Sequence, residues 1–423
     1  MRATRGSLTA VWAALLLLLL AACTGAPRPA GPTGGPSGGP PPSAGGPPPS
    51  GTAPGTRTGP YGAPARIPSA PGLPGWAHSL GFAADGSGFV LLVQCVTDEA
   101  RPTNGFCRQQ VAALDRGARS WALRSTPLPE IPPSRGVSAG LTVLGPGRAL
   151  IEDGGGEEPE RTWFTRDGGR SWRAVDRRTV GTTPLIPAGA VLTTACVAPA
   201  RATPEECARE RLVVISPEDG RRRALARVPA LGAHPRPAAV PEPDGSWWVS
   251  GTDPLTGRTG LAVSRDAGRS WSPARLTGTA GRPGHGAVVA VGPDAVYAAE
   301  LGELDAGEPV KNPLRALHRS VDGGRTFTRM WTTGPDAEPR SLLGLPVPGP
   351  GGRVRVDAEP RAYASEDGGR TFGATESGSS WVRRTGIGLL REAGDRCVYA
   401  TTRDGVRWSE FRLACEDPVG GGA

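Results

Sequence analysis

The sequence is short of several residue types that large classes of proteins need. Lys311 is the only lysine, the chain has only 4 His, and no two of its 7 Cys stand in a Cys-x-x-Cys spacing. No cluster of basic residues forms a stripe, which argues against nucleic-acid binding. The scattered His and Cys argue against a zinc site. P-loop, HExxH, GxSxG and dinucleotide motifs are also missing, so we expect no metal and no cofactor.

The formal net charge of +8 overstates the charge of the folded part. Five of these excess positive charges stand near the N-terminus, at Arg2, Arg5, Arg28, Arg57 and Arg66. The basic residues are almost all Arg, and Ala, Gly and Pro are abundant, a composition typical of GC-rich, actinobacterial-like genomes. The charge therefore gives no support to a nucleic-acid partner.

Long hydrophobic runs are also scarce, since the one clear run, from Leu8 to Leu20, is too short to remain as a membrane span. It follows two arginines and ends in Leu20-Ala21-Ala22-Cys23, the layout of a secretory signal. That tetrapeptide resembles the bacterial lipobox, in which the Cys is acylated after cleavage. We therefore expect a signal peptide over 1–22 and a lipidated Cys23 that anchors the protein to the outer face of the cell membrane.

The next segment is almost entirely Gly, Pro, Ser, Ala and Thr, and it contains no acidic residue. Such a composition cannot bury enough apolar surface to fold. We expect residues 23–75 to carry the lipid and form a disordered tether, residues 76–416 to fold, and residues 417–423 to form a disordered tail.

The six cysteines other than Cys23 agree with export, because they fall in close sequential pairs. Fifteen connectivities are formally possible, and the local one is geometrically easiest in a chain rich in hairpins. We therefore expect the disulfides Cys95–Cys107, Cys196–Cys207 and Cys397–Cys415.

One octapeptide occurs four times, as TRDGGRSW, SRDAGRSW, SVDGGRTF and SEDGGRTF, and a shortened form, TTRDGVRW, follows. In each copy an Asp and a Gly stand between two strand-like runs, so the motif is expected to cap a β-hairpin. The carboxylate accepts turn N–H groups, and the final aromatic ring packs on neighbouring strands. The residues in these roles are Asp167, Asp266, Asp322, Asp367, Asp404, Trp172, Trp271, Phe327, Phe372 and Trp408.

This motif resembles the Asp box of the sialidase-like (BNR repeat) β-propeller family. Degenerate copies at Asp115 and Asp219 complete a series of seven hairpins, spaced by 37 to 56 residues. A further hairpin with its own turn precedes each of them, as at Glu242-Pro243-Asp244-Gly245. Four antiparallel strands per unit and about 49 residues per unit indicate an all-β, seven-bladed propeller. An open solenoid is the main alternative, although it would leave exposed edges.

The resemblance implies a fold, not an activity, because the family includes sialidases, other glycoside hydrolases, sortilin-type receptors and photosystem assembly factors. In that family the Asp-box carboxylates are structural. A sialidase would have an Arg-Ile-Pro motif on its first strand, three substrate-binding arginines, and a Tyr–Glu nucleophile pair. Arg66-Ile67-Pro68 stands in the Pro/Gly-rich segment, where we interpret it as chance, and Tyr297 and Tyr399 stand in alternating strands that favour packing. We assign no catalytic residue.

Loop composition favours one face of the propeller as an interaction surface. The loops Val96–Phe106, Glu152–Thr162, Val197–Glu206 and Glu300–Pro313 are expected to join the second and third strands of their blades, opposite the Asp boxes, and several are acidic. Their charge indicates either solvated loops or a site for a cation or a basic ligand; the candidate binding residues are Glu157, Glu158, Glu303 and Asp305. We expect a lipid-anchored binding or scaffold module for a protein or carbohydrate; the alternative is an exo-sialidase-type glycoside hydrolase.

Overall fold

The computed structural model describes residues 60–96, 104–132, 135–154, 160–200, 207–279, 284–302, 314–334, 336–340, 342–357, 361–378, 380–392 and 397–416. The expected signal peptide, Cys23, most of the expected tether and the 417–423 tail lie outside these residues. Within the described ranges no helix has the length and apolarity that a membrane span requires.

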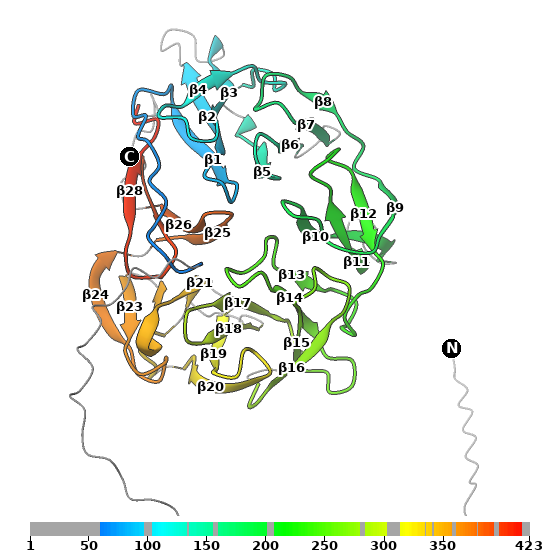
Figure 1. Ribbon diagram of the computed structural model, residues 1–423, viewed down its shortest axis with the longest axis vertical. Helices are drawn as coiled ribbons and strands as arrows, with labels where there is room; N and C mark the ends of the chain where they lie inside the picture. Colours follow the sequence, from blue (N-terminus) through cyan, green and yellow to red (C-terminus); the bar gives the residue numbers. More distant parts are fainter. Residues whose placement is uncertain are drawn as a thin grey trace, which may run out of the picture. The chain divides into compact units, whose positions relative to one another are not determined.

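The described chain is an all-β propeller, in which four-stranded sheets follow one another around a ring (Figure 1). The first blade consists of β1 (Trp76–Phe82), β2 (Gly88–Val96), β3 (Phe106–Leu114) and β4 (Ala122–Arg124). The second consists of β5 (Gly140–Val143), β6 (Ala149–Asp153), β7 (Arg161–Thr165) and β8 (Arg173–Ala174). The third contains β9 (Thr179–Thr183), β10 (Val191–Pro199), β11 (Cys207–Ile215) and β12 (Arg222–Leu225).

The remaining blades complete the ring. The fourth consists of β13 (Arg236–Pro237), β14 (Trp247–Thr252), β15 (Thr259–Ser264) and β16 (Ser272–Leu276). The fifth consists of β17 (Ala287–Val291), β18 (Val296–Leu301), β19 (Leu314–Ser320) and β20 (Thr326–Thr332). The sixth consists of β21 (Leu343–Pro348), β22 (Val354–Asp357), β23 (Arg361–Ser365) and β24 (Gly373–Gly378), with a 3-10 turn η3 (Pro350–Gly352). The seventh consists of β25 (Val382–Thr385), β26 (Gly388–Glu392), β27 (Val398–Thr402) and β28 (Ser409–Arg412).

The third blade departs from the expected pattern of four antiparallel strands. Its strand order is β10-β11-β12-β9, and β9 pairs with β12 in parallel on the outer edge instead of forming the innermost strand. β16 likewise pairs in parallel with β20, which joins the fourth and fifth blades into one sheet of eight strands. These parallel pairings cover outer edges whose backbone groups would otherwise be open to other chains.

The seam between the first and seventh blades closes the ring. The Gly386 N–H donates to the Phe82 carbonyl at 2.9 Å, and the Phe82 ring meets Phe411 edge-on at 5.9 Å between centroids. Residues 60–75, which we expected to belong to the tether, are described and take part in this closure. Ile67 is buried in the same core cluster, and Ala70 pairs with Leu413. The packed part of the chain therefore begins before Trp76.

The aromatic ring of each complete Asp box fills the seam with the preceding blade. Phe327 of the fifth blade is fully buried and meets Trp248 of the fourth edge-on at 6.0 Å. Trp172, Trp271 and Phe372 are partly buried against the cores next to them. The two indoles remain partly exposed because their N–H groups donate to backbone carbonyls of the preceding blade, Trp172 to Ser125 and Trp271 to Arg227, each at 3.0 Å.

Candidate functional site

The Asp-box carboxylates hold turns together, as the sequence indicates. Asp322 accepts the backbone N–H groups of Arg325 and Thr326 at 2.9 and 3.0 Å. The hydrogen bond from the Thr326 N–H is the main cause that lowers the pKa of Asp322 to about 2. Asp167, Asp266, Asp367 and Asp404 accept turn N–H groups in the same way. Because these carboxylates already accept hydrogen bonds from the turns, they have little remaining capacity to bind a substrate.

The acidic loops join the strands that we expected, but their candidate residues are not described. β2 and β3, β6 and β7, β10 and β11, and β18 and β19 are consecutive antiparallel pairs. Glu157, Glu158, Glu303 and Asp305 lie outside the described residues. Two acidic residues at the loop stems already have partners within the protein. Glu152 is 2.5 Å from an Arg222 Nη atom. Glu300, which is fully buried in β18, is 2.9 Å from Nε2 of His318.

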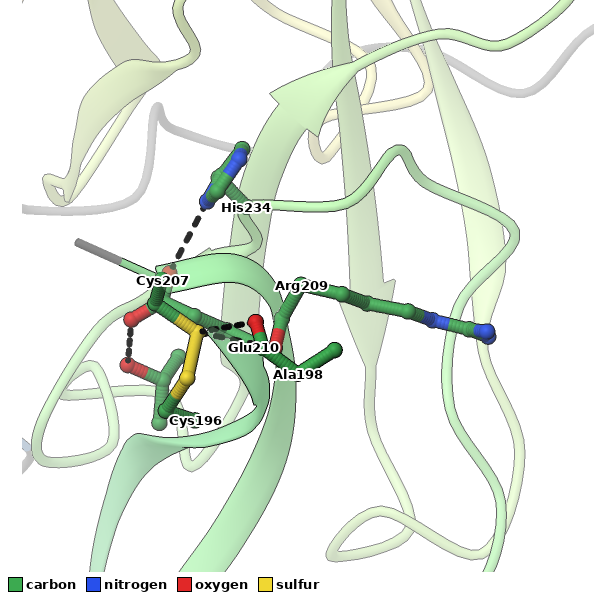
Figure 2. Close-up of a disulfide and its surroundings, with 7 residues drawn as sticks. Cys196, Ala198, Cys207, Arg209, Glu210 and His234 are labelled. Carbon is green, nitrogen blue, oxygen red and sulfur yellow. Dashed lines mark hydrogen bonds and ion pairs between the residues drawn. A yellow bond between two sulfur atoms is a disulfide. The ribbon is translucent and has the colours of Figure 1, made fainter. Parts of the chain in front are cut away.

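Three disulfides connect the cysteine pairs expected from the sequence: Cys95–Cys107, Cys196–Cys207 and Cys397–Cys415. Cys196 and Cys207 join β10 to β11 at the base of a loop, as Figure 2 shows. In the same view Oε2 of Glu210 lies 3.5 Å from Nδ1 of His234. Three disulfides indicate an oxidising, extracytoplasmic environment. In the described part of the chain, no group of three or more His, Cys, Asp or Glu side chains could hold a metal ion.

A cavity lies where the central channel opens on the Asp-box face. Its volume is about 410 Å³, and its wall includes residues from the turn before the second strand of every blade. Glycine lets these turns approach one another. A Cβ on Gly189, whose φ is +80°, would lie 2.6 Å from the Leu144 carbonyl oxygen, and one on Gly386 would lie 2.6 Å from the Ala84 nitrogen. Other wall residues are Phe82, Val143, Ala190, Val240, Pro241, Pro243, Val291, Pro348, Ile387 and Leu389.

Glu242 is the carboxylate of this mostly apolar cavity, and its side chain is only 1% exposed. Its Oε2 accepts the Val291 N–H at 2.7 Å and lies 2.6 Å from an Nη atom of Arg384, whose side chain is 10% exposed. Burial raises the pKa of Glu242 to about 7, although Arg384 and the Val291 N–H both oppose the rise. Glu242 therefore changes its charge near neutral pH.

Two further polar side chains reach the cavity. Arg403, from the Asp-box turn of the seventh blade, lines the wall, and its Nε donates to the Ile387 carbonyl at 3.2 Å. Tyr61 enters from the N-terminal segment and donates its hydroxyl to the Gly292 carbonyl at 2.9 Å. Arg403 makes no ion pair with any residue that the structure describes. The cavity thus combines an apolar wall, one internal ion pair and one further guanidinium.

Around the cavity, the features that a sialidase needs do not come together. A Tyr–Glu hydrogen bond does exist, between Tyr363 and Glu338, and it is the main cause that raises the pKa of Tyr363, but neither residue lines the cavity. Arg66 is exposed, and Ile67 packs in the closing seam, so Arg-Ile-Pro is not on the first strand. Tyr297 and Tyr399 are buried, as expected. Burial is the main cause that raises the pKa of these two tyrosines and of Tyr61. A nucleophilic Tyr needs the opposite shift, because its anion is the reactive form.

The sequence did not single out the residues of this cavity. Glu242 stands in a turn that we predicted correctly, yet the partners of its carboxylate come from the fifth and seventh blades. Tyr61 and Pro60 stand in the segment expected to be disordered. The topology of a propeller blade could have identified Glu242, because the turn before the second strand of each blade faces the mouth of the central channel. Glu242 stands in such a turn.

Comparisons with known proteins agree with the fold. No protein-family model and no curated protein sequence matches the chain. Among solved structures it is similar to YCF48 bound to D1 peptide (14% identity, TM-score 0.31, 84% of each chain covered) and to YCF48 from Cyanidioschyzon merolae (12% identity, TM-score 0.35, 83% of this chain and 99% of that one). It is also similar to YjhT (11% identity, TM-score 0.35, 81% of this chain and 99% of that one). At such identities and TM-scores the likeness carries no argument about this chain, whose β-propeller architecture rests on its own sheets and Asp-box turns.

Proposed function

We propose that this protein is an extracytoplasmic binding module, anchored to the membrane through a lipid on Cys23, and that its ligand site is the cavity on the Asp-box face. The anchor rests on the lipobox-like Leu20-Ala21-Ala22-Cys23 behind an apolar signal. The three disulfides support location outside the cytoplasm. The ligand is a protein segment or a carbohydrate.

The buried Glu242–Arg384 pair in a cavity of about 410 Å³ is the observation that carries this proposal. Ligand sites are concave and mostly apolar, with a few converging polar groups, and this cavity has that composition. The Glu242–Arg384 pair is not needed to close the ring of blades, because backbone hydrogen bonds and aromatic contacts already close it. Buried ion pairs also add little net stability in general, since desolvation offsets their attraction.

A cavity-filling variant tests the site. Ala84 is exposed at the wall of the cavity, so Ala84→Trp places a large ring in the mouth without entering the core. Leu255→Trp is the matched control, because Leu255 is 94% exposed and does not line the cavity. We expect the purified full-length protein to bind members of a peptide or glycan array, and Ala84→Trp to weaken that binding at least tenfold while Leu255→Trp leaves it unchanged.

Three outcomes would contradict this proposal. Binding that Ala84→Trp does not alter would move the site away from the cavity. Binding lost on reversing Glu157, Glu158, Glu303 and Asp305 would instead move it to the acidic loops. Hydrolysis of a sialoside by the purified protein, abolished by Tyr61→Phe, would make the protein a glycoside hydrolase with Tyr61 as its nucleophile.

A further inference from the structure

The Tyr61 side chain forms part of the cavity wall. Its hydroxyl donates to the Gly292 carbonyl in the turn between β17 and β18, and Pro60 lies beside it in the wall. The pKa of Tyr61 is raised well above its usual value, first by burial and then by the nearby carboxylates of Asp244 and Glu242. The phenol therefore stays a neutral donor.

The chain that follows is fixed by contacts that do not involve Tyr61. The Ala65 carbonyl accepts the Thr401 hydroxyl at 3.1 Å, and the Pro68 carbonyl accepts the Trp121 indole N–H at 2.9 Å. Ile67 is buried and Ala70 pairs with Leu413. The closing seam thus holds the segment from Ala65 onward, whereas Tyr61 is attached to the cavity by its own hydrogen bond. The seam contacts of Ala65 and Pro68 therefore do not depend on the hydrogen bond from Tyr61 to Gly292.

We propose that Pro60–Tyr61 is a resident stand-in for the ligand of this cavity, and that the ligand is a peptide segment of a partner protein that presents a Pro-Tyr pair. This inference rests on the proposed function. It adds the class of ligand and the competition from Pro60–Tyr61 that limits binding of the ligand. The wall includes Pro241, Pro243 and Pro348, whose rings would offer apolar surface to the proline of the ligand. The Gly292 carbonyl supplies the acceptor for a phenol.

Tethering makes the resident pair a competitor. A segment joined to its own binding site acts at an effective concentration in the millimolar range, so a free peptide gains access only when it binds more tightly or is locally concentrated. In the resting state Tyr61 therefore holds the Gly292 carbonyl, while a volume of about 410 Å³ stays open beside it. Removing the Tyr61 ring should open the cavity to an external copy of the same sequence.

The test uses the full-length protein and a labelled nonapeptide, TRTGPYGAP, which copies residues 56–64. Tyr61→Ala should bind this peptide at least tenfold more tightly than the wild type or the exposed-surface control Leu255→Ala. Tyr61→Phe keeps the ring and loses one hydrogen bond, so its affinity for the peptide should lie between those of the wild type and Tyr61→Ala. This variant keeps the test valid if Tyr61→Ala does not fold. A peptide with alanine in place of tyrosine should lose at least tenfold in affinity for Tyr61→Ala.

The outcomes separate this inference from the function on which it rests. Equal affinity of the peptide for the wild type and Tyr61→Ala, or no binding to Tyr61→Ala and Tyr61→Phe while both keep native circular dichroism, overturns the inference. If an array ligand still binds and Ala84→Trp still weakens it, the proposed function stands without the inference. If Ala84→Trp affects no ligand, both fail.

Discussion

Oε2 of Glu242 and an Nη atom of Arg384 lie 2.6 Å apart, and this ion pair joins the fourth blade to the seventh at the mouth of the central channel. The Val291 N–H adds a contact from the fifth blade to the same oxygen. A single buried carboxylate therefore connects three blades that are far apart in the sequence. Its protonation should affect both the stability of the ring and the charge of the cavity.

The first prediction concerns the pH dependence of stability. Burial raises the pKa of Glu242 from 4.5 to about 7, so between these values the folded protein binds more protons than the unfolded chain. The stability that protonated Glu242 contributes is complete below pH 4.5 and is lost as the pH rises through 7. The loss should amount to about 3 kcal/mol. Glu242→Gln cannot titrate, so its free energy of unfolding in urea should lack this slope.

Arg384→Leu provides the complementary variant. Arg384 lowers the pKa of Glu242 against the effect of burial, so its removal should raise that pKa further and move the loss of stability to higher pH. An unchanged pH profile in both variants would show that Glu242 is not the titrating group.

The second prediction concerns acid. The Ser270 hydroxyl and the Thr326 N–H are the main causes that lower the pKa values of Asp266 and Asp322, respectively, from 3.8 to about 2. A lowered pKa gives stability that is present above pH 3.8 and lost as the pH falls through 2. Asp322→Asn should flatten this acid limb in urea titrations, whereas the exposed control Glu366→Gln should not. Between pH 3.8 and 4.5 the contributions of Asp266, Asp322 and Glu242 are all present.

The sequence predicts the hairpins well because their chemistry is local. In the box that begins at Ser264, the hydroxyl, the accepting Asp266 carboxylate and the turn N–H that donates to it lie within eight residues, so the pattern itself specifies the geometry. The disulfide Cys196–Cys207 is predictable for the same reason, since it spans one hairpin. Regular spacing of such hairpins then determines the number of blades.

The cavity and the edges of the ring depend on long-range contacts that no local pattern encodes. Glu242 is an ordinary turn residue until Arg384 from another blade is placed beside it. Tyr61 stands among Gly and Pro, a composition that predicts disorder, yet it has a defined partner in Gly292. The structure pairs Thr179–Thr183 in parallel with the outer edge of β12, although four antiparallel strands were expected in each blade. In each case the deciding interaction is tertiary.

The third prediction concerns the disulfides. Replacing both Cys196 and Cys207 by Ser should lower the free energy of unfolding by about 3 kcal/mol, because the unfolded chain regains the freedom of the closed loop. Urea unfolding of the double variant measures the loss. Peptide mapping of the wild type without reductant should recover the three pairs, and a crossed pattern would contradict the strand pairing.

The fourth prediction concerns the anchor. Cys23→Ala should remove the acylation site and release the protein from the membrane fraction, since the lipid is the expected attachment. Mass spectrometry of the mature wild-type N-terminus should show the added lipid. Ser7→Ala, a change in the signal that leaves the lipobox intact, is the matched control. Unchanged fractionation of Cys23→Ala would refute lipid anchoring.

The fifth prediction decides between the two faces of the propeller. The acidic-loop hypothesis expects a basic partner, and salt should weaken its binding. The cavity hypothesis expects a neutral Pro-Tyr segment, whose packing and single hydrogen bond respond little to salt. Reversing the charges of Glu157, Glu158, Glu303 and Asp305 together, by substitution with Lys, leaves the Asp-box turns and the cavity wall unchanged. We therefore expect this charge-reversed variant to be as stable as the wild type. Combined with Tyr61→Ala, it should bind TRTGPYGAP as tightly as Tyr61→Ala alone. Ala84→Trp combined with Tyr61→Ala should abolish binding of the peptide. A partner that binds with strong salt dependence and is lost on charge reversal alone would instead assign recognition to the acidic loops.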